Sequence, residues 1–385
     1  MPILVQKYGG TSVNTIDKRS KVLDKIIAAK NKGYDVVVVV SAMGRKGEPY
    51  ATDTLLDLLQ AVGPDPRPRT KDLLASCGEI ISTCVVAHAL EQRGYQACPM
   101  TGIQAGIETN EVYTNAQIQN IDSNRVKEAL RNGEIVVLAG FQGYTGDMSV
   151  TTLGRGGSDT TAIAIGGALG AEMVEIYTDV PGVAFTDPRL VPEAPYLKSI
   201  DFYPLYVLAR AGSKVVHHRA VQTAITYRRP FVVRSTFDDK EGTVIGEAGE
   251  SFNGFYGIAL QKNILVLQVN GQDPDGFWKG KAVDELFYQN DQNGCVLAIP
   301  AGASGFLQEV GNTGYDISEE CDLLTVMWDP QSMITPKKIE ELLAEGDITA
   351  RGFFDFKSGG AWAVPVPQTG PALRLLFHSS KKAVF

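Results

Sequence analysis

The first residues whose types could bind a ligand or take part in a reaction are Lys7-Tyr8-Gly9-Gly10-Thr11-Ser12, which follow an apolar run starting at Ile3. Two adjacent glycines let the backbone approach a ligand closely, with amide groups that can point toward an anion. Lys7 adds a compact positive charge suited to a phosphoryl group. In an open α/β sheet, ligands bind beyond the carboxyl ends of strands, where this segment would lie. On spacing alone, an ordinary strand–helix turn with Thr11 or Ser12 as N-cap explains these residues equally well.

A second glycine-rich segment is Gly154-Arg155-Gly156-Gly157-Ser158-Asp159-Thr160-Thr161, and small residues follow it from Ala162 to Ala168. The glycines can open a turn, Ser158 or Asp159 can cap a helix, and small residues let that helix pack closely on a sheet. Arg155 offers a planar guanidinium for a carboxylate or phosphate. Asp159 can position the ammonium of Lys7 or of an incoming amino group. The alternative is a capped surface turn with a solvated arginine.

A third segment, Tyr177-Thr178-Asp179-Val180-Pro181-Gly182-Val183, ends an apolar pattern in polar residues and a Pro-Gly turn, and Asp187-Pro188-Arg189 follows it. This order places polar groups at the carboxyl end of another strand, where they would suit a nucleoside and its phosphates. Taken alone, the segment is also explained as a plain strand–turn unit.

The signature motifs of several common enzyme classes are absent from the sequence. It contains no GxxxxGK[ST] P-loop, no HRD or DFG segment, no GxGxxG after a strand and no GxSxG elbow. These absences exclude the P-loop and protein-kinase routes to phosphoryl transfer and a serine-hydrolase elbow.

The elements that must position these residues alternate between short apolar runs and helical patterns up to about residue 235. Val36–Val40 is an unbroken valine run, which favours a central strand covered on both faces. Strand–helix alternation predicts a three-layer α/β/α domain with a mostly parallel sheet. The predicted strands are Ile3–Tyr8, Asp35–Ser41, Ile135–Gly140, Met173–Tyr177 and Phe231–Arg234, and the predicted helices are Asp17–Lys32, Thr70–Arg93 and Ser123–Arg131.

The pattern changes after Gly242–Ser251, a small, polar and acidic stretch that is typical of a linker. Beyond it, strand and helix patterns form two weakly similar strand–helix–strand units, which predict two small α+β modules. We therefore expect a catalytic domain over residues 1–246 and a second region over 252–385. The predicted strands there are Gly257–Val269, Leu323–Met327 and Ala361–Val366, and the predicted helices are Lys281–Tyr288 and Pro336–Ala344.

The composition of the chain disfavours several classes of partner and site. A net charge of −8 and a pI near 5.2 disfavour a nucleic-acid or anionic-membrane partner. Five scattered cysteines without a CxxC pair, and only four histidines, argue against a disulfide framework or a zinc site. No basic-then-apolar leader is visible and no apolar run approaches the roughly 20 residues of a membrane span, so a soluble cytoplasmic protein is expected.

Taken together and in order, these segments resemble the aspartate kinases. Lys7 to Ser12 is similar to their K-[FY]-G-G-T-S signature, and the likeness extends over about residues 3–246. The segment Arg45–Ala51 resembles the bacterial, diaminopimelate-pathway type. The other matching segments are Ser41–Gly44, Thr52-Asp53, Gly78-Glu79, Gly140-Phe141, Gly154–Asp159, Thr178–Val180, Asp187–Arg189, Gly212–Val216, Arg219–Val221 and Val233–Phe237.

The resemblance implies the amino acid kinase fold and transfer of the γ-phosphoryl of ATP to the side-chain carboxylate of L-aspartate, giving 4-phospho-L-aspartate. Lys7 would stabilise the transferring group, Asp159 would organise Lys7, and Mg²⁺ would be held through the ATP phosphates rather than by protein side chains. The acceptor is already ionised at neutral pH, so no strong general base is required.

The resemblance also implies which residues contact the two substrates. L-aspartate would be held by Ser41, Thr52, Glu79, Phe141 and Arg155, with Glu79 near its ammonium and Arg155 on its α-carboxylate. ATP would be contacted by Lys7, Gly9, Gly10, Ser12, Gly157, Ser158, Thr178, Asp179, Arg189 and Lys214.

Two segments depart from the family's pattern within this region. Ala184-Phe185 stands where Tyr-Thr or Met-Thr is common, so an aromatic displaced by one position is left to pack on the adenine. His217-His218-Arg219 replaces a His-Pro-Arg or Ser-Pro-Arg turn. A metal site at the two histidines is disfavoured, because neighbouring helical residues point to different faces.

Aspartate kinases carry paired ACT modules after the kinase domain, which bind end-product amino acids and dimerise. Here Lys262–Val266 suits a first ACT strand, whereas Asp329–Met333, Phe353–Phe356 and Trp362 depart from the usual effector pattern. Two interpretations stay open: modules kept for dimerisation with altered or lost effector binding, and intact sensing of lysine, threonine or diaminopimelate. A homodimer or larger homo-oligomer is expected in either case.

Two other functions remain alternatives to aspartate kinase. One is a related amino acid kinase with another carboxylate acceptor, and Glu79 with Arg155 favours an α-amino acid in that role. The other is a non-catalytic regulatory paralogue. The intact Lys7, Asp159 and Lys214 argue against it, because a protein without activity would be free to lose them.

Overall fold

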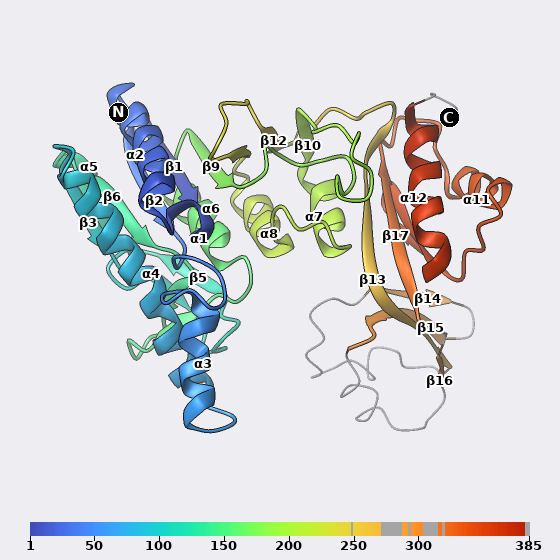
Figure 1. Cartoon of the computed structure of the whole chain (residues 1–385), viewed down its shortest axis with the longest axis horizontal. Coiled ribbons are helices and arrows are strands. Elements are labelled where there is room, and N and C mark those ends of the chain that lie inside the picture. Colours follow the sequence, from blue (N-terminus) through green and yellow to red (C-terminus); the bar gives the residue numbers. More distant parts are fainter. Residues whose placement is uncertain (248, 271–286, 292–293, 303–314, 318–319, 382–385) are drawn as a thin grey trace. The chain divides into compact units, whose positions relative to one another are not determined.

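The computed structural model describes residues 1–247, 249–270, 287–291, 294–302, 315–317 and 320–381 (Figure 1). The chain divides into two compact units. The first combines Met1–Val183 with Val215–Gly249, and the second combines Ala184–Lys214 with Glu250–Phe385.

The first unit is built on a mostly parallel sheet in the order β12-β11-β9-β1-β2-β6-β3 (Figure 1). All neighbours are parallel except β11 and β12, which are antiparallel. This confirms the predicted fold class. The strands are β1 (Ile3–Tyr8), β2 (Asp35–Val40), β3 (Ala97–Met100), β6 (Ile135–Ala139), β9 (Met173–Thr178), β11 (Phe231–Ser235) and β12 (Thr243–Gly246).

Helices cover both faces of this sheet. Leu4 and Tyr8 of β1 pack with residues of α2 (Ile16–Asn31) in one buried cluster. Val5 and Val174 lie on the other face, next to Gly166 of α6 (Gly157–Leu169), where a Cβ would meet Val174 at 2.4 Å. Because successive strand residues alternate between faces, α2 and α6 lie on opposite sides of the sheet. The unit therefore has three layers.

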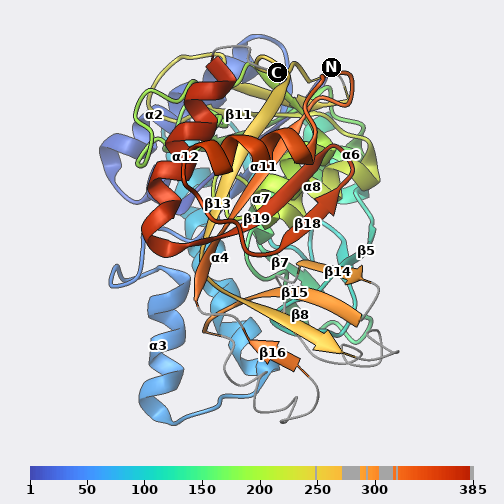
Figure 2. The same cartoon turned by 90° about the vertical axis from the view of Figure 1, so that its right-hand side faces the viewer.

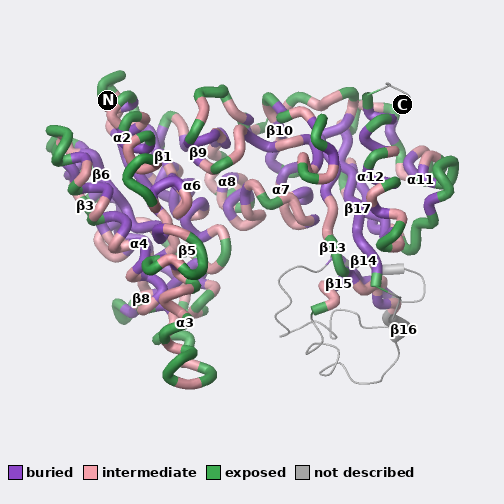
Figure 3. The backbone as a smooth tube through the Cα atoms, in the orientation of Figure 1, coloured by how far each residue is buried: buried purple, intermediate pink, exposed green. Residues whose placement is uncertain are grey.

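The remaining helices of the unit include α4 (Pro68–Glu91), which packs on β3 and β6, and α8 (His218–Tyr227), which packs on α6. Shorter helices are α1 (Gly10–Val13), α3 (Thr52–Val62) and α5 (Asn124–Arg131). Figure 3 shows α3 as a mixture of exposed and intermediate residues, and none of its residues is buried. The helices predicted at Asp17–Lys32, Thr70–Arg93 and Ser123–Arg131 are confirmed as α2, α4 and α5.

Helix α4 differs from its sequence interpretation in one respect. In the part of the chain that the structure describes, α4 alone is long and apolar enough to cross a membrane by length and composition. The apolar-run criterion did not single it out, because Asp72 and Glu79 interrupt its sequence. Both carboxylates are buried, and half of the most apolar stretch of α4 is also buried inside the unit, as in a core helix.

A small second sheet, in the order β5-β4-β7-β8, adjoins α4. It is anchored by Asp72, whose carboxylate accepts hydrogen bonds from the Thr114 amide at 2.9 Å, the Thr152 amide at 2.8 Å and the Thr152 hydroxyl at 2.7 Å. This anchor fixes the segment that leads into Gly154 and Arg155. The strands are β4 (Ile107–Thr109), β5 (Ile118–Ile121), β7 (Gln142–Tyr144) and β8 (Val150–Thr152).

The second unit contains an antiparallel sheet in the order β14-β15-β13-β17-β19-β18, with β16 paired to β13. All eight residues of β17 (Cys321–Trp328) are buried, because α7 (Phe202–Arg210) and α12 (Val366–Lys381) both pack on it. Figure 2 shows α12 with α11 (Pro336–Glu345) beside these strands. The other strands are β13 (Phe255–Asn270), β14 (Phe287–Asp291), β15 (Gly294–Pro300), β16 (Tyr315–Ile317), β18 (Phe353–Phe356) and β19 (Gly359–Pro365). This β-rich unit is consistent with ACT-like modules.

Three local predictions for the C-terminal part need correction. The linker predicted at Gly242–Ser251 contains β12, whose Val244 and Ile245 pair with Val232 and Phe231. The strand predicted at Ala361–Val366 is β19, which ends at Pro365, and Val366 is the first residue of α12. Most of the helix predicted at Lys281–Tyr288 lies outside the described residues, and its last two residues belong to β14. The strand at Leu323–Met327 and the helix at Pro336–Ala344 are confirmed.

Candidate active site

The centre of the candidate site is an ion pair between a strand of the main sheet and the helix that covers it. Lys7 lies near the carboxyl end of β1, and Asp159 lies in the first turn of α6. Their Nζ and Oδ1 atoms are 2.7 Å apart, and each side chain is only 12% exposed. A lysine paired in this way is held in position, so it can meet a phosphoryl group that arrives at the strand end.

The turn after β1 is fixed by a close approach that only glycine permits. A Cβ on Gly10 would lie 2.1 Å from the carbonyl oxygen of Ala42, in the segment that follows β2. The Gly10 carbonyl accepts a hydrogen bond from the Gly44 amide at 3.1 Å. Ser12 is fully buried and its hydroxyl lies 2.8 Å from that of Thr236, after β11. The glycine turn is therefore packed against the segments that follow two other strands.

Glu79 of α4 is a buried carboxylate at the same edge. It is 3% exposed, and its Oε1 accepts a hydrogen bond from the Ala42 amide at 3.1 Å. Its Oε2 is buried and has no hydrogen-bond partner among the described residues. Burial raises the pKa of Glu79 to about 8, against the lowering effect of the Ala42 amide. Such a group lacks a cationic partner, which the ammonium of an amino acid would supply.

The segment around Arg155 is shaped by backbone conformation. Gly154 and Gly156 both have a φ of 72°, so the turn needs residues without a side chain there. Phe141 also adopts a positive φ of 71°, and a Cβ on Gly157 would lie 2.7 Å from its ring. The Arg155 side chain is exposed, and no ion-pair partner is found for it within the described ranges. Arg155 is thus left free to meet an anionic group.

Three further predicted residues lie in the same unit. Ser41 follows β2, and its amide donates to the Tyr8 carbonyl at 3.1 Å. Thr52 is the first residue of α3. Ser158, in the first turn of α6, lies against Gly140, where a Cβ would meet it at 2.8 Å.

The predicted nucleotide residues are divided between the two units. Thr178 ends β9, its carbonyl accepts a hydrogen bond from the Thr236 amide at 2.8 Å, and Asp179 next to it forms an exposed ion pair with Arg45 at 3.2 Å. Arg189 and Lys214 belong to the second unit. There Arg189 is paired with Asp187 at 2.6 Å, which helps to hold the pKa of that carboxyl below its usual range.

Phe185 does not offer the adenine platform considered from the sequence. It is 1% exposed and packs in the second unit against the rings of Phe252, Phe255 and Phe377. The aromatic shifted by one position is therefore part of a core. His217 is the N-cap of α8, where its ring nitrogen accepts from the Arg219 amide. Within the described ranges, no group of three His, Cys, Asp or Glu residues is placed to hold a metal ion.

Three residues that support the site were not identified from the sequence as such. Thr236 links the turns after β1 and β9, and Asp72 anchors β8. Arg219 contacts the side-chain oxygen of Asn115 and the Leu153 carbonyl, just before the Arg155 turn. Arg219 occurs in a segment similar to the aspartate kinases, but its role depends on contacts far apart in the sequence.

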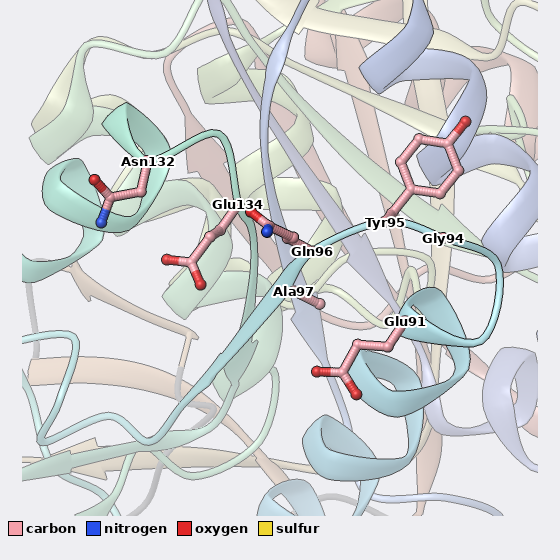
Figure 4. A pocket seen from close by; sticks show the side chains of 7 residues that line it. All are labelled: Glu91, Gly94, Tyr95, Gln96, Ala97, Asn132 and Glu134. Carbon is pink, nitrogen blue, oxygen red and sulfur yellow. The ribbon is translucent and has the colours of Figure 1, made fainter.

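The first unit also has hollows away from these residues. One, of about 560 Å³, lies beside the start of β3 (Figure 4). The carboxylates of Glu91 and Glu134 point to the same side of it, while the Tyr95 ring points away. None of the predicted site residues lines this hollow.

The first unit thus combines a mostly parallel sheet, a lysine paired at one strand end, two glycine turns and a buried carboxylate. The chain belongs to the amino acid kinase family, whose sequence profile matches residues 2–235.

Named relatives and solved structures are similar to this chain. An aspartokinase of Geobacillus stearothermophilus is 47% identical over 273 residues, which cover 71% of this chain and 64% of the relative. Aspartokinase 1 of Bacillus subtilis is 48% identical over 245 residues, covering 64% of this chain and 61% of the relative. The chain thus spans less than two thirds of the length of these relatives.

Among solved structures, E. coli aspartokinase III in complex with aspartate and ADP aligns with a TM-score of 0.80 at 24% identity, over 98% of this chain and 99% of that one. This likeness shows the fold. The aspartate kinase of Synechocystis aligns with a TM-score of 0.58 at 29% identity, covering 98% of this chain and 69% of that one.

Proposed function

We propose that the protein is an aspartate kinase, which transfers the γ-phosphoryl of ATP to the side-chain carboxylate of L-aspartate. The observation that supports this most directly is Glu79, a buried carboxylate with no cationic partner among the residues that the structure describes, at the same strand edge as the Lys7–Asp159 pair. One group suits the ammonium of an amino acid and the other suits a phosphoryl group. The similarity to aspartokinases supports aspartate as that amino acid.

The chemistry follows from these placements. The substrate carboxylate attacks the γ-phosphorus, the bond to the ADP oxygen breaks, and no proton has to be removed from the nucleophile. Lys7, oriented by Asp159, compensates charge on the transferring group. Glu79 would hold the α-ammonium and Arg155 the α-carboxylate, so the side-chain carboxylate is oriented toward the phosphate. Ser41, Thr52 and Phe141 would complete the aspartate site.

The nucleotide would meet the glycine turn after β1 and the segments that follow β9. Its proposed contacts are Gly9, Gly10, Ser12, Gly157, Ser158, Thr178, Asp179, Arg189 and Lys214. Mg²⁺ would come with the phosphates and neutralise their charge. Asp159 is already engaged by Lys7, which fits a metal held mainly by phosphate oxygens rather than by a dedicated carboxylate cage.

We also propose the setting in which this activity operates. It would be cytoplasmic and would supply the first step of lysine, threonine, methionine and diaminopimelate synthesis. The catalytic domain would span residues 1–246. Residues 252–385 would form ACT-like modules for homodimerisation or a larger homo-oligomer. Lysine, threonine or diaminopimelate is the expected type of effector, if sensing is retained.

The direct test is trapping of the acyl phosphate with hydroxylamine. We expect hydroxamate from ATP and L-aspartate with the wild-type chain, and none with Lys7→Ala, whose far-UV circular dichroism should match the wild type. Lys21→Ala, an exposed lysine on α2, is the matched control. Hydroxamate from a different amino acid but not from aspartate would assign another acceptor. No hydroxamate from any acceptor would leave a non-catalytic paralogue as the better interpretation.

A further inference from the structure

The central sheet carries a second hollow, on its α2 face and away from the candidate active site. It has a volume of about 530 Å³ and opens beside β9 and β11, between α2 and residues 238–240. The connection from β11 to β12 is a loop rather than a helix, so the face of these two strands next to α2 lacks the cover that a further crossover helix would supply. A hollow of this size can hold a small organic molecule.

The floor of this hollow is polar, although the rest of that sheet face is apolar. Glu175 of β9 is 8% exposed and accepts hydrogen bonds from the Gln6 amide group at 2.9 Å and the Tyr177 hydroxyl at 3.0 Å. Arg234 of β11 lies 3.3 Å from its other oxygen. A buried ionic network costs desolvation that an apolar floor would avoid. Such a floor is suited to a polar occupant.

The charges around the hollow are not equally free. Its carboxylates are engaged. Glu175 accepts two hydrogen bonds and is paired with Arg234, Glu172 accepts from the Tyr34 hydroxyl at 3.1 Å, and Asp239 pairs with Lys25 at 3.0 Å. Asp238 accepts from a backbone amide of its own turn at 3.1 Å.

The cations are less satisfied than the carboxylates. Lys32 and Lys240 are exposed at the rim and have no ion-pair partner within the described residues. The Nε of Arg234 is buried there without a hydrogen-bond partner. The unused donors and charges are therefore positive, and they favour an anion.

We propose that this hollow is a second ligand pocket, which takes a small organic anion through a phosphate or carboxylate group. Arg234 would form its floor and Lys32 and Lys240 its rim. The pocket is distinct from the proposed substrate sites, because Gln6 and Lys7 are successive residues of β1 and point to opposite faces. The same alternation separates Tyr177 from Thr178 at the end of β9. The proposal does not depend on which amino acid the active site phosphorylates.

The test measures binding rather than activity, with two probes that differ only in the anionic group. Phenyl phosphate and benzoate are titrated separately into the full chain, and line broadening of the probe's ³¹P or ¹H resonances gives the Kd. The Lys7→Ala chain is the parent, so that the catalytic lysine does not contribute an anion contact. Binding of either probe identifies which anionic group the pocket accepts.

Two variants of this parent address the pocket by different means. Ala28→Trp places a large ring in the hollow from an exposed position on α2. Lys32→Glu with Lys240→Glu reverses the two rim charges. Lys337→Glu with Lys338→Glu changes the net charge equally on α11 and is the control.

We expect each pocket variant to raise the Kd of the probe at least tenfold, and the control variant to leave that Kd unchanged. Unfolding temperatures verify that every chain is folded, and since the two pocket variants act independently, failure of one to fold leaves the other decisive. The proposal is overturned if neither probe binds the parent at millimolar concentration. It is also overturned if a folded Ala28→Trp chain binds as tightly as the parent.

Discussion

Glu79 gives the most direct test of the proposed aspartate site, through the pH dependence of the KM for aspartate. Burial raises the pKa of Glu79 to about 8. Only the ionised carboxylate attracts the substrate ammonium. At pH 7 roughly one tenth of Glu79 is ionised, so the apparent KM is about ten times its limiting value at high pH. We expect the KM for aspartate to fall as the pH rises from 6.5 to about 8.5, and then to level.

The measurement is the initial rate of hydroxamate formation at varied aspartate and saturating ATP, across this pH range. Glu79→Gln keeps the size of the side chain but removes the titration, so its KM should be higher and nearly independent of pH. Glu91→Gln, on the exposed end of the same helix, should retain the wild-type profile. A flat wild-type profile, or a Glu79→Gln chain that keeps the slope, would refute the assigned role of Glu79.

Glu79→Gln, which should weaken aspartate binding, should instead increase the stability of the fold at neutral and alkaline pH. The pKa of Glu79 is raised above the 4.5 of an unperturbed glutamate, so its favourable contribution is complete below pH 4.5 and is lost as the pH rises through 8. A displacement of this size corresponds to roughly 5 kcal/mol at most. In urea titrations without substrate, Glu79→Gln should therefore be progressively more stable than the wild type between pH 5 and pH 8.5. Parallel curves for the two chains would contradict the buried environment of this carboxyl.

Three further substitutions test other contacts. Gly10→Ala places a Cβ 2.1 Å from the Ala42 carbonyl, so the turn must shift, and we expect the kcat for hydroxamate formation to fall at least tenfold while the far-UV spectrum is kept. Glu175→Gln breaks the ion pair between β9 and Arg234 of β11 but keeps a hydrogen-bonding side chain, and should lower the free energy of unfolding by about 1–3 kcal/mol in urea titrations. Asp72→Ala removes the acceptor of the hydrogen bonds from the Thr114 amide and from the Thr152 amide and hydroxyl of β8, and should cost about 2–4 kcal/mol by the same measurement. An unchanged kcat in the first case, or unchanged stability in the others, would show that the contact concerned has no such effect.

Much of the first unit could be predicted because its signals are local. The valines of β2 are all fully buried, with β1 on one side and β6 on the other, as an unbroken β-branched run indicates. The ends of β1 and β9 could also be predicted, since Lys7 and Thr178 lie where mostly apolar segments end. In contrast, β12 was not predicted, because it lies in a mostly polar stretch and its own short sequence shows no clear strand pattern. It is a strand because it pairs with β11.

The arrangement of the site residues could be predicted only in part. The resemblance to a known family identified Glu79 and Arg155 as candidates. It did not reveal the raised pKa of Glu79, which depends on the Ala42 amide and on the surrounding core. The hydrogen bond between Ser12 and Thr236 joins positions 224 residues apart. No local pattern encodes such a contact. Phe185 shows the opposite failure, since an aromatic at a plausible ligand position proved to be a core residue.

The strand order explains why the end of β1 gathers these contacts. β1 lies between β2 and β9, and β11 follows β9. The turn after β1 therefore meets the segment after β2 through Gly10 and Gly44, and the segment after β11 through Ser12 and Thr236. An edge strand could be supported from one side only. In a parallel sheet, the segments that follow the strands all lie at the same edge. A charge at the end of a central strand can therefore be held in position by segments on both sides of it. Lys7 occupies that place.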